Sequence, residues 1–166
     1  MRFNKYINEI KMSSDTKIEV TKRAHPYTIR ISIDDGMDVF EVIGERFEDD
    51  EEVEMEGVGA FSGSIQRYKT GDIIKWWEVD FYDENGETDL APKRKGVAIK
   101  LFAALPQAIK MFIKDKKPKD FRFSAKTNEP SRVRLYDRLS KMIKGYKLKR
   151  YTEKADNNYI TWQFIK

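Results

Sequence analysis

The chain has 166 residues, of which 40% are hydrophobic and 36% are charged, and this balance is typical of a single folded domain over 1–166. It is too apolar for a disordered chain and too charged for a membrane protein, and no run reaches the roughly 18 apolar residues of a membrane helix. Cysteine is absent and His25 is the only histidine, which excludes disulfides, cysteine-based zinc sites and histidine-rich metal sites. The first residues lack the apolar core of a secretory signal, so we expect a cytoplasmic protein without a metal.

Charge is segregated along the chain. Residues 34–90 carry 19 acidic and 4 basic side chains, whereas residues 91–154 carry 20 basic and 5 acidic ones. If the fold keeps these two blocks apart, the basic surface favours phosphate groups of a nucleic acid or a cofactor. The alternative is that the two blocks pair with each other. The acidic run over 48–52 is expected in an exposed turn, because like charges resist burial.

The first half of the chain predicts an antiparallel meander. A short helix is expected over 2–12, where apolar residues recur at helical spacing. Strict alternation predicts a half-buried strand over 27–33, and a turn then leads to a returning strand over 38–47. The glycine-rich stretch 53–67 indicates at most an irregular strand. A strong strand is expected over 73–83.

The second half predicts a helix, a strand, a second helix and a final hairpin. Apolar residues recur every three or four positions over 97–114, which indicates one buried helical face. A short strand over 121–125 precedes a helix over 129–143, and two strands over 146–152 and 159–165 complete the chain. We therefore predict an α+β domain with a mixed, mostly antiparallel sheet, two main helices and an N-terminal β-meander.

Two local patterns in this half resemble the GNAT acetyltransferases. Residues 93–98 read K-R-K-G-V-A and open a predicted helix, and they are similar to the acyl-CoA loop Q/R-x-x-G-x-G/A of that family. Residues 128–136 read N-E-P-S-R-V-R-L-Y and resemble the family helix that ends in Leu-Tyr. The order of elements over 73–166 is also similar to the C-terminal half of the GNAT fold. GNAT-like proteins of bacteriophages, with an F-x-F-S-A strand before S-R-x-x-L-Y, are the most similar in pattern.

The resemblance implies a divergent acyl-CoA-dependent N-acyltransferase, with acetyl-CoA as cofactor and an amine of unspecified identity as acceptor. The residues that it places around the cofactor are Lys93, Arg94, Lys95, Gly96, Val97, Ala98, Ser124 and Asn128. It makes Tyr136 the general acid, and it places Glu78 and Asp80 beside the acceptor, where either can serve as the base. A phage origin would place the protein in the cytoplasm of the host cell.

The chemistry of the loop can be argued without the family. A glycine at a helix start lets the backbone approach a diphosphate, and the free N–H groups and the positive helix end then bind it. Bases at a helix start oppose the macrodipole, so Lys93, Arg94 and Lys95 weaken the helix unless an anion offsets them. The alternative is a surface loop that forms ion pairs with the acidic block.

Each candidate residue also has a structural alternative. Glu78 and Asp80 can simply face solvent, Tyr136 can be a core tyrosine, and Ser124 and Asn128 are ordinary choices at a strand end and a helix cap. The rival function is a non-catalytic GNAT-like protein that binds a protein or a nucleic acid through its charged faces. Its basic face would include a ridge of arginines on the second helix, at positions 132, 134 and 138.

Overall fold

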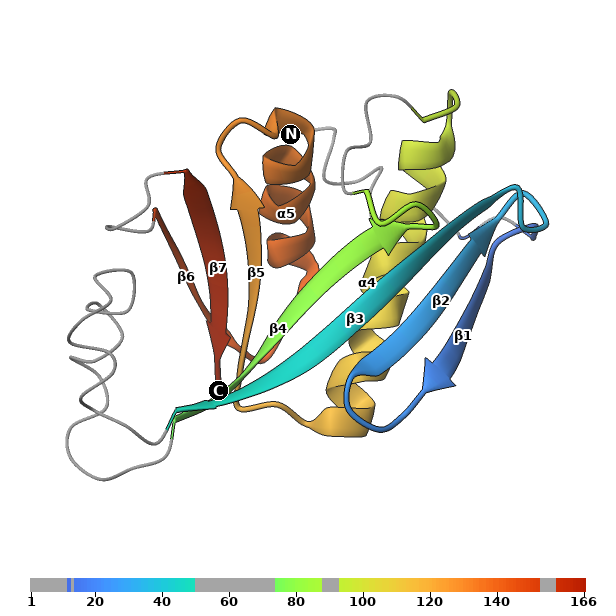
Figure 1. The fold of residues 1–166 in the computed structure, drawn as a ribbon. Helices are drawn as coiled ribbons and strands as arrows, with labels where there is room; N and C mark the ends of the chain where they lie inside the picture. Colours follow the sequence, from blue (N-terminus) through green and yellow to red (C-terminus); the bar gives the residue numbers. More distant parts are fainter. Residues whose placement is uncertain (1–11, 13, 50–73, 88–92, 153–157) are drawn as a thin grey trace.

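The computed structural model describes residues 12, 14–49, 74–87, 93–152 and 158–166, and the structural statements below concern these residues. They form an α+β fold with one mixed seven-stranded sheet and two helices (Figure 1). The elements in chain order are β1 (Lys17–Lys22), β2 (Tyr27–Ile33), β3 (Asp38–Asp49), β4 (Ile74–Asp83), α4 (Val97–Lys116), β5 (Asp120–Lys126), α5 (Pro130–Met142), β6 (Lys147–Thr152) and β7 (Tyr159–Ile165).

The predicted α+β class and the predicted elements from β2 to β7 are confirmed, and their described ends differ from expectation by no more than two residues. Strand β1 was not predicted. It lies at the edge of the sheet, and only Ile18 and Val20 among its six residues are apolar, so its alternation is too short to be distinctive. The helix expected over 2–12 lies outside the described residues except for residue 12, and the irregular strand expected within 53–67 lies wholly outside them.

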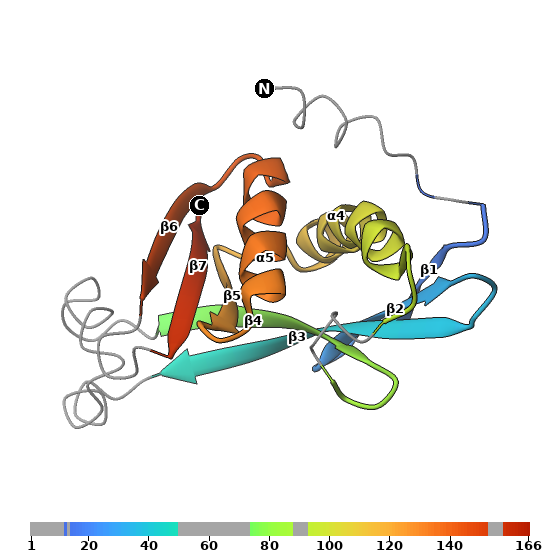
Figure 2. The same cartoon turned by 90° about the horizontal axis from the view of Figure 1, so that it is seen from above.

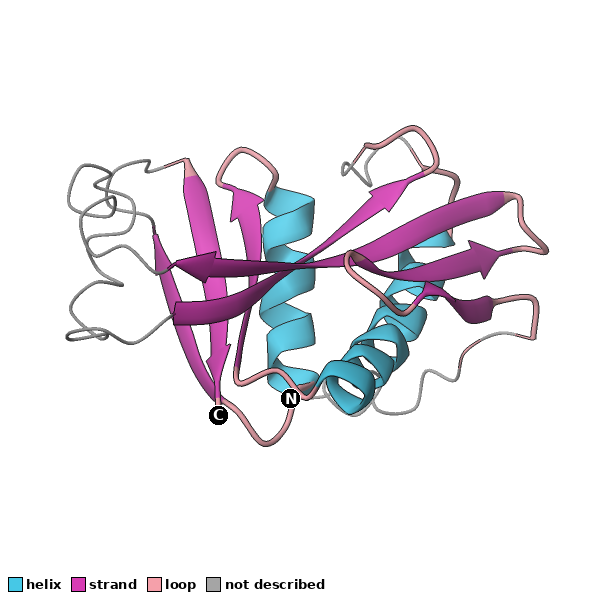
Figure 3. Ribbon diagram, turned by 60° about the horizontal axis from the view of Figure 1, so that its bottom comes forward, coloured by secondary structure: helices cyan, strands magenta, loops and turns pink. Residues whose placement is uncertain are grey.

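The sheet has the order β1-β2-β3-β4-β5-β7-β6, and every neighbouring pair is antiparallel except β4 and β5. Both helices lie on the same face of this curved sheet (Figures 2 and 3). Helix α4 packs mainly on β2, and α5 packs on β5 and β7. The apolar core lies between the helices and this face of the sheet, because the alternating residues of β2 and the helical stripe of α4 are both buried.

Strands β4 and β5 touch only briefly. Their parallel pairing consists of Trp77 with Phe121 and Glu78 with Arg122, whereas β3 and β4 pair over ten positions. Beyond these two pairs β4 runs on to Asp83 and β5 to Lys126, and the two strands separate (Figure 1). We call this separation the fork. It divides the sheet into a four-stranded half and a three-stranded half.

Candidate functional site

An arginine of α5 bridges the two halves of the sheet within the fork, close to the point where β4 and β5 separate. The Nη2 atom of Arg132 donates a hydrogen bond to Oδ1 of Asp80 on β4 at 2.9 Å, and another to the hydroxyl of Tyr136 at 3.0 Å. Its guanidinium carbon lies 4.9 Å from the ring centroid of Phe81. Strand β4 therefore supplies Asp80, and helix α5 supplies Arg132 and Tyr136, to one polar cluster. This cluster packs against the aromatic ring of Phe81.

Burial governs the protonation of this cluster. It raises the pKa of Asp80, and the positive charge of Arg132 opposes that shift. It also raises the pKa of Tyr136, with a further contribution from the negative charge of Asp80. Tyr136 therefore keeps its proton throughout the neutral range, and the pKa of Asp80 moves toward the range of a useful base.

Tyr136 is both a core residue and a member of the cluster. It is 1% exposed, and its ring stacks on Phe123 with centroids 5.1 Å apart and meets the edge of Trp162. The two interpretations of this residue from the sequence are therefore compatible, because the ring fills the core while the hydroxyl reaches Arg132.

Glu78 lies two residues before Asp80, at the closed end of the fork. It accepts a hydrogen bond from the indole nitrogen of Trp76 at 3.4 Å and pairs in register with Arg122. Burial raises the pKa of Glu78, and the Trp76 hydrogen bond opposes that shift. Glu78 and Asp80 are thus both half-buried, which differs from the alternative in which they simply face solvent.

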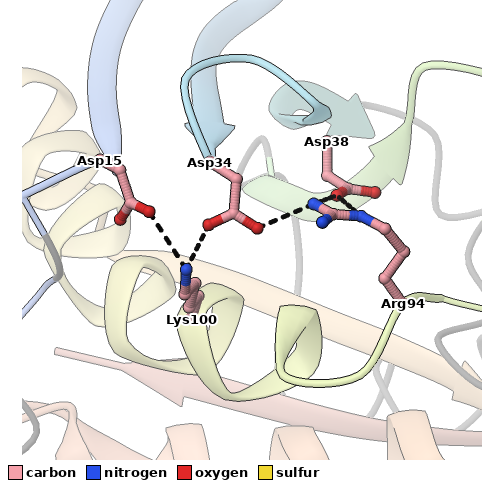
Figure 4. Close-up of polar contacts among 5 residues, drawn as sticks. All are labelled: Asp15, Asp34, Asp38, Arg94 and Lys100. Carbon is pink, nitrogen blue, oxygen red and sulfur yellow. Dashed lines mark hydrogen bonds and ion pairs between the residues drawn. The ribbon is translucent and has the colours of Figure 1, made fainter.

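The basic loop before α4 pairs with carboxylates of the acidic block. Lys93 forms an ion pair with Asp83 at the end of β4. Arg94 donates from Nη2 to Asp34 at 2.8 Å and from Nε to Asp38 at 2.9 Å (Figure 4). Asp34 lies in the turn between β2 and β3, and Asp38 is the first residue of β3. The structural alternative for this loop is therefore confirmed for both residues.

Lys100 extends the same network into the first turns of α4. It forms ion pairs with Asp15 at 3.2 Å and with Asp34 (Figure 4). Asp34 thus receives one cation from the loop and one from the helix. These contacts hold the start of α4 against the β2–β3 hairpin. The carboxylates also compensate the basic charge, which would otherwise oppose the helix dipole.

The backbone around Gly96 is nevertheless open. Gly96 is the N-cap of α4 with a φ of 88°, and a Cβ placed there would meet no atom within 4 Å. Val97 is buried in the core, whereas Lys95 and Ala98 are exposed. The N–H of Val97 donates to the carbonyl of Arg94 at 3.2 Å. The part of the loop that could receive a diphosphate therefore consists of Lys95 and of backbone other than this N–H, rather than of Lys93 and Arg94.

The remaining predicted cofactor residues are Ser124 and Asn128. The hydroxyl oxygen of Ser124 lies 3.0 Å from that of Thr161 on the neighbouring strand β7. Asn128 is exposed in the turn before α5, and the N-cap of that helix is Glu129, which makes no side-chain capping bond. The suggestion that Asn128 caps the helix is therefore wrong.

Arg132 is the member of the cluster that sequence reasoning did not place. The arginine ridge predicted on α5 included it, but Arg132 is 5% exposed whereas Arg134 and Arg138 are exposed. The spacing of four residues between Arg132 and Tyr136 was the available signal, because such residues are neighbours on a helix.

Within the described ranges, no group of three or more histidine or acidic side chains is arranged to hold a metal ion. No helix in the same ranges has the length and apolar character needed to cross a membrane. The sequence matches no family model and no curated protein.

Proposed function

We propose that this protein is a divergent GNAT-like N-acyltransferase that takes acyl-CoA at the fork. The observation that carries the proposal is the two-pair parallel contact of β4 and β5. The GNAT fold splays its sheet between the corresponding strands to admit the cofactor. Here the helix that follows β4 begins at a glycine with open space around it, which suits the approach of a diphosphate.

Acyl transfer needs a base, a hydrogen-bond donor to the oxyanion and an acid. The polar cluster in the fork contains one group for each role. Asp80 takes the proton of the acceptor ammonium, and the amine nitrogen then attacks the thioester carbon. Arg132 stabilises the oxyanion of the tetrahedral intermediate. As the C–S bond breaks, Tyr136 gives its proton to the leaving thiolate. Arg132 stabilises the phenolate until it takes up the second proton, which the nitrogen loses as it becomes an amide. Before the reaction the acceptor must displace Arg132 from Asp80.

A second candidate is a non-catalytic protein that binds a partner through its charged surfaces. It is favoured by the contacts of Lys93 and Arg94 with carboxylates of the same chain, because these contacts occupy two of the three loop cations. In that case the fold would be shared with the acetyltransferases and the cofactor would not bind.

Calorimetric titration with acetyl-CoA tests the proposal, using Gly96→Leu and the matched control Gly145→Leu. Both glycines have a positive φ, 88° and 82°, and open space around the Cβ position, so backbone strain is similar in the two variants. We expect saturable binding by the wild type and by Gly145→Leu, and binding at least tenfold weaker in Gly96→Leu. Absence of binding at millimolar acetyl-CoA, or an equal loss in both variants, contradicts the proposal.

Turnover is measured as release of free thiol in the presence of a panel of amines. Replacement of Asp80 by asparagine should lower kcat by about 100-fold, a typical loss for a general base, while acetyl-CoA binding is retained. Glu78→Gln is the matched control on the same strand face, and it should change kcat much less. A larger effect of Glu78→Gln would assign the base to Glu78 instead.

A further inference from the structure

A separate feature lies at the opposite end of α4 from Gly96. An open pocket of about 710 Å³ is formed where β3, β4, the β1–β2 connection and the end of α4 meet. The side chains that matter for its chemistry are Arg46, Lys116, Lys117, Lys119, His25 and Trp77. None of the described residues that line it is acidic, so four cations converge on one depression.

The helix dipole explains only part of this charge. Lysines are favourable at a helix C-terminus, and Lys116 lies in the last turn of α4. Arg46, however, comes from β3, and Lys119 lies in the connection to β5. The acidic residue of this helix end, Asp115, accepts hydrogen bonds from Arg23 and Tyr27, both at 2.7 Å, and does not line the pocket. The mutual repulsion of Lys116, Lys117 and Lys119 favours an anionic ligand.

Aromatic rings form part of the same pocket. His25 and Trp77 lie with ring centroids 6.3 Å apart, and the ammonium of Lys116 is 5.7 Å from the Trp77 ring. The Nε2 atom of His25 accepts a hydrogen bond from the backbone N–H of Arg46 at 3.0 Å, which fixes the position of the ring. Trp77 is half-buried, whereas the other two tryptophans are at most 5% exposed.

The cationic surface continues beyond the pocket. The backbone N–H of Lys166 donates to the carbonyl of Lys119 at 2.9 Å, and the Lys166 ammonium lies 5.8 Å from the ring of Tyr146. The Tyr146 hydroxyl donates to the carbonyl of Pro118 at 2.8 Å. Cations and a half-buried ring therefore extend from the pocket to the end of β7, which suits an elongated anion better than a single small one.

We propose that this pocket binds a single strand of nucleic acid. The phosphates contact Lys116, Lys117 and Lys119, and a base packs against His25 and Trp77. Single-strand binding combines a cationic groove with aromatic side chains, and the pocket has both. The site is distinct from the fork, so it does not depend on the acyltransferase proposal.

Fluorescence anisotropy with a labelled 12-nucleotide single strand tests the inference. Three phosphate contacts predict that affinity falls by about 20-fold between 50 and 200 mM salt. We expect Lys117→Gln/Lys119→Gln to weaken binding at least tenfold at 100 mM salt and to flatten the salt dependence. The matched control is Lys17→Gln/Lys126→Gln, which removes two exposed lysines, one on β1 and one on β5. This variant should bind as the wild type does.

A second readout is tryptophan fluorescence. We expect the strand to quench it in the wild type and to quench it much less in Trp77→Phe, since Trp77 is the tryptophan that lines the pocket. Absence of binding at 50 mM salt, equal weakening in both double variants, or binding of inorganic phosphate or ATP without binding of the strand overturns the inference.

The two proposals fail separately. Because acetyl-CoA also carries phosphates, its titration is repeated with Lys117→Gln/Lys119→Gln. Binding that survives in this variant but is lost in Gly96→Leu belongs to the loop before α4. Binding lost only in the double lysine variant belongs to the pocket and contradicts the acyltransferase proposal alone.

Discussion

Arg132 of α5 and Asp80 of β4 form an ion pair within the fork, with Nη2 and Oδ1 2.9 Å apart. The side chain of Arg132 is only 6% exposed and that of Asp80 is 31% exposed. Their separation in sequence is 52 residues, so the pair exists only when both halves of the sheet are assembled. It is thus a link between the two halves as well as the centre of the candidate site.

Replacing Arg132 by methionine should destabilise the fold and shift the titration of Asp80. Removal of the cation leaves a carboxylate in a poorly solvated place, which we expect to cost about 2 kcal/mol at pH 7, below the range for fully buried pairs because Asp80 is partly exposed. The pKa of Asp80, already raised by burial, should rise further. Urea unfolding and NMR titration of the carboxyl carbon measure the two effects.

The upward shift of the Asp80 pKa determines how the stability of Arg132→Met depends on pH. A carboxyl whose pKa is raised in the folded state stabilises the fold below its ordinary pKa, and this stabilisation is lost as the pH rises through the folded pKa. The deficit of the variant should therefore grow from pH 4 to pH 7. Adding Asp80→Asn should recover part of it. If the double variant is as unstable as the single one at both pH values, packing rather than charge explains the loss.

Asp83 titrates in the opposite direction. Burial alone would raise its pKa, but the ion pair with Lys93 and hydrogen bonds from the amides of Glu87 and Asn85, at 2.8 and 2.9 Å, lower it below the ordinary value. We expect Asp83→Asn to cost about 1–2 kcal/mol at pH 7, because the bond from Lys93 loses its charged acceptor.

A carboxyl whose pKa is lowered in the folded state stabilises the fold at pH values above its ordinary pKa. This stabilisation is lost as the pH falls through the pKa of the folded state. The difference in free energy of unfolding between the wild type and Asp83→Asn should therefore shrink below pH 4. Lys93→Met is the companion variant, since adding it to Asp83→Asn should cost little more. A constant difference across the pH range would contradict the assigned role of the ion pair.

Local periodicity predicted most of the fold because most elements bury one regular face. Strand β2 has its alternate residues, such as Ile29 and Ile31, fully buried, so its pattern reflects its packing. Edge strand β1 buries little, and it was missed for that reason. The parallel contact of β4 and β5 depends on how the two halves of the sheet meet, which no local pattern encodes.

The candidate site was predictable only in part. Asp80 was expected from its strand face and Tyr136 from its helix motif, but the residue that joins them was assigned to a solvent-exposed ridge. A buried arginine gives no periodic signal, because its place is set by a partner from another element. The partners of Arg94, including Asp38 at a separation of 56 residues, likewise follow from the packing of α4 on the β2–β3 hairpin.

Asp38→Asn should strengthen acetyl-CoA binding if the proposed function is correct. Asp38 accepts two hydrogen bonds from Arg94, so its neutralisation leaves that guanidinium more available to a diphosphate beside Gly96. Because exposed ion pairs are weak, we expect the affinity to increase by about threefold. Calorimetry at low salt measures this change.

Asp35→Asn is the matched control for Asp38→Asn. It removes the same charge from the same β2–β3 hairpin, at a residue that is exposed and makes no ion pair with Arg94. Its affinity for acetyl-CoA should stay close to that of the wild type. An equal gain in both variants would indicate a general charge effect, and no gain in Asp38→Asn would separate Arg94 from the cofactor.

Lys117→Gly should affect stability and nucleic-acid binding in opposite directions. Lys117 ends α4 in the left-handed conformation, with a φ of 46°, and its N–H donates to the carbonyl of Ile113 at 2.9 Å. Glycine adopts this conformation without the Cβ penalty, so we expect a gain of about 1 kcal/mol and a midpoint of thermal unfolding about 2–4 °C higher. The same change removes a pocket cation and should weaken binding of the single strand several-fold. Thermal unfolding and anisotropy on the same samples measure both effects, and a lower unfolding midpoint would mean that the Lys117 side chain stabilises the helix end more than the backbone strain destabilises it.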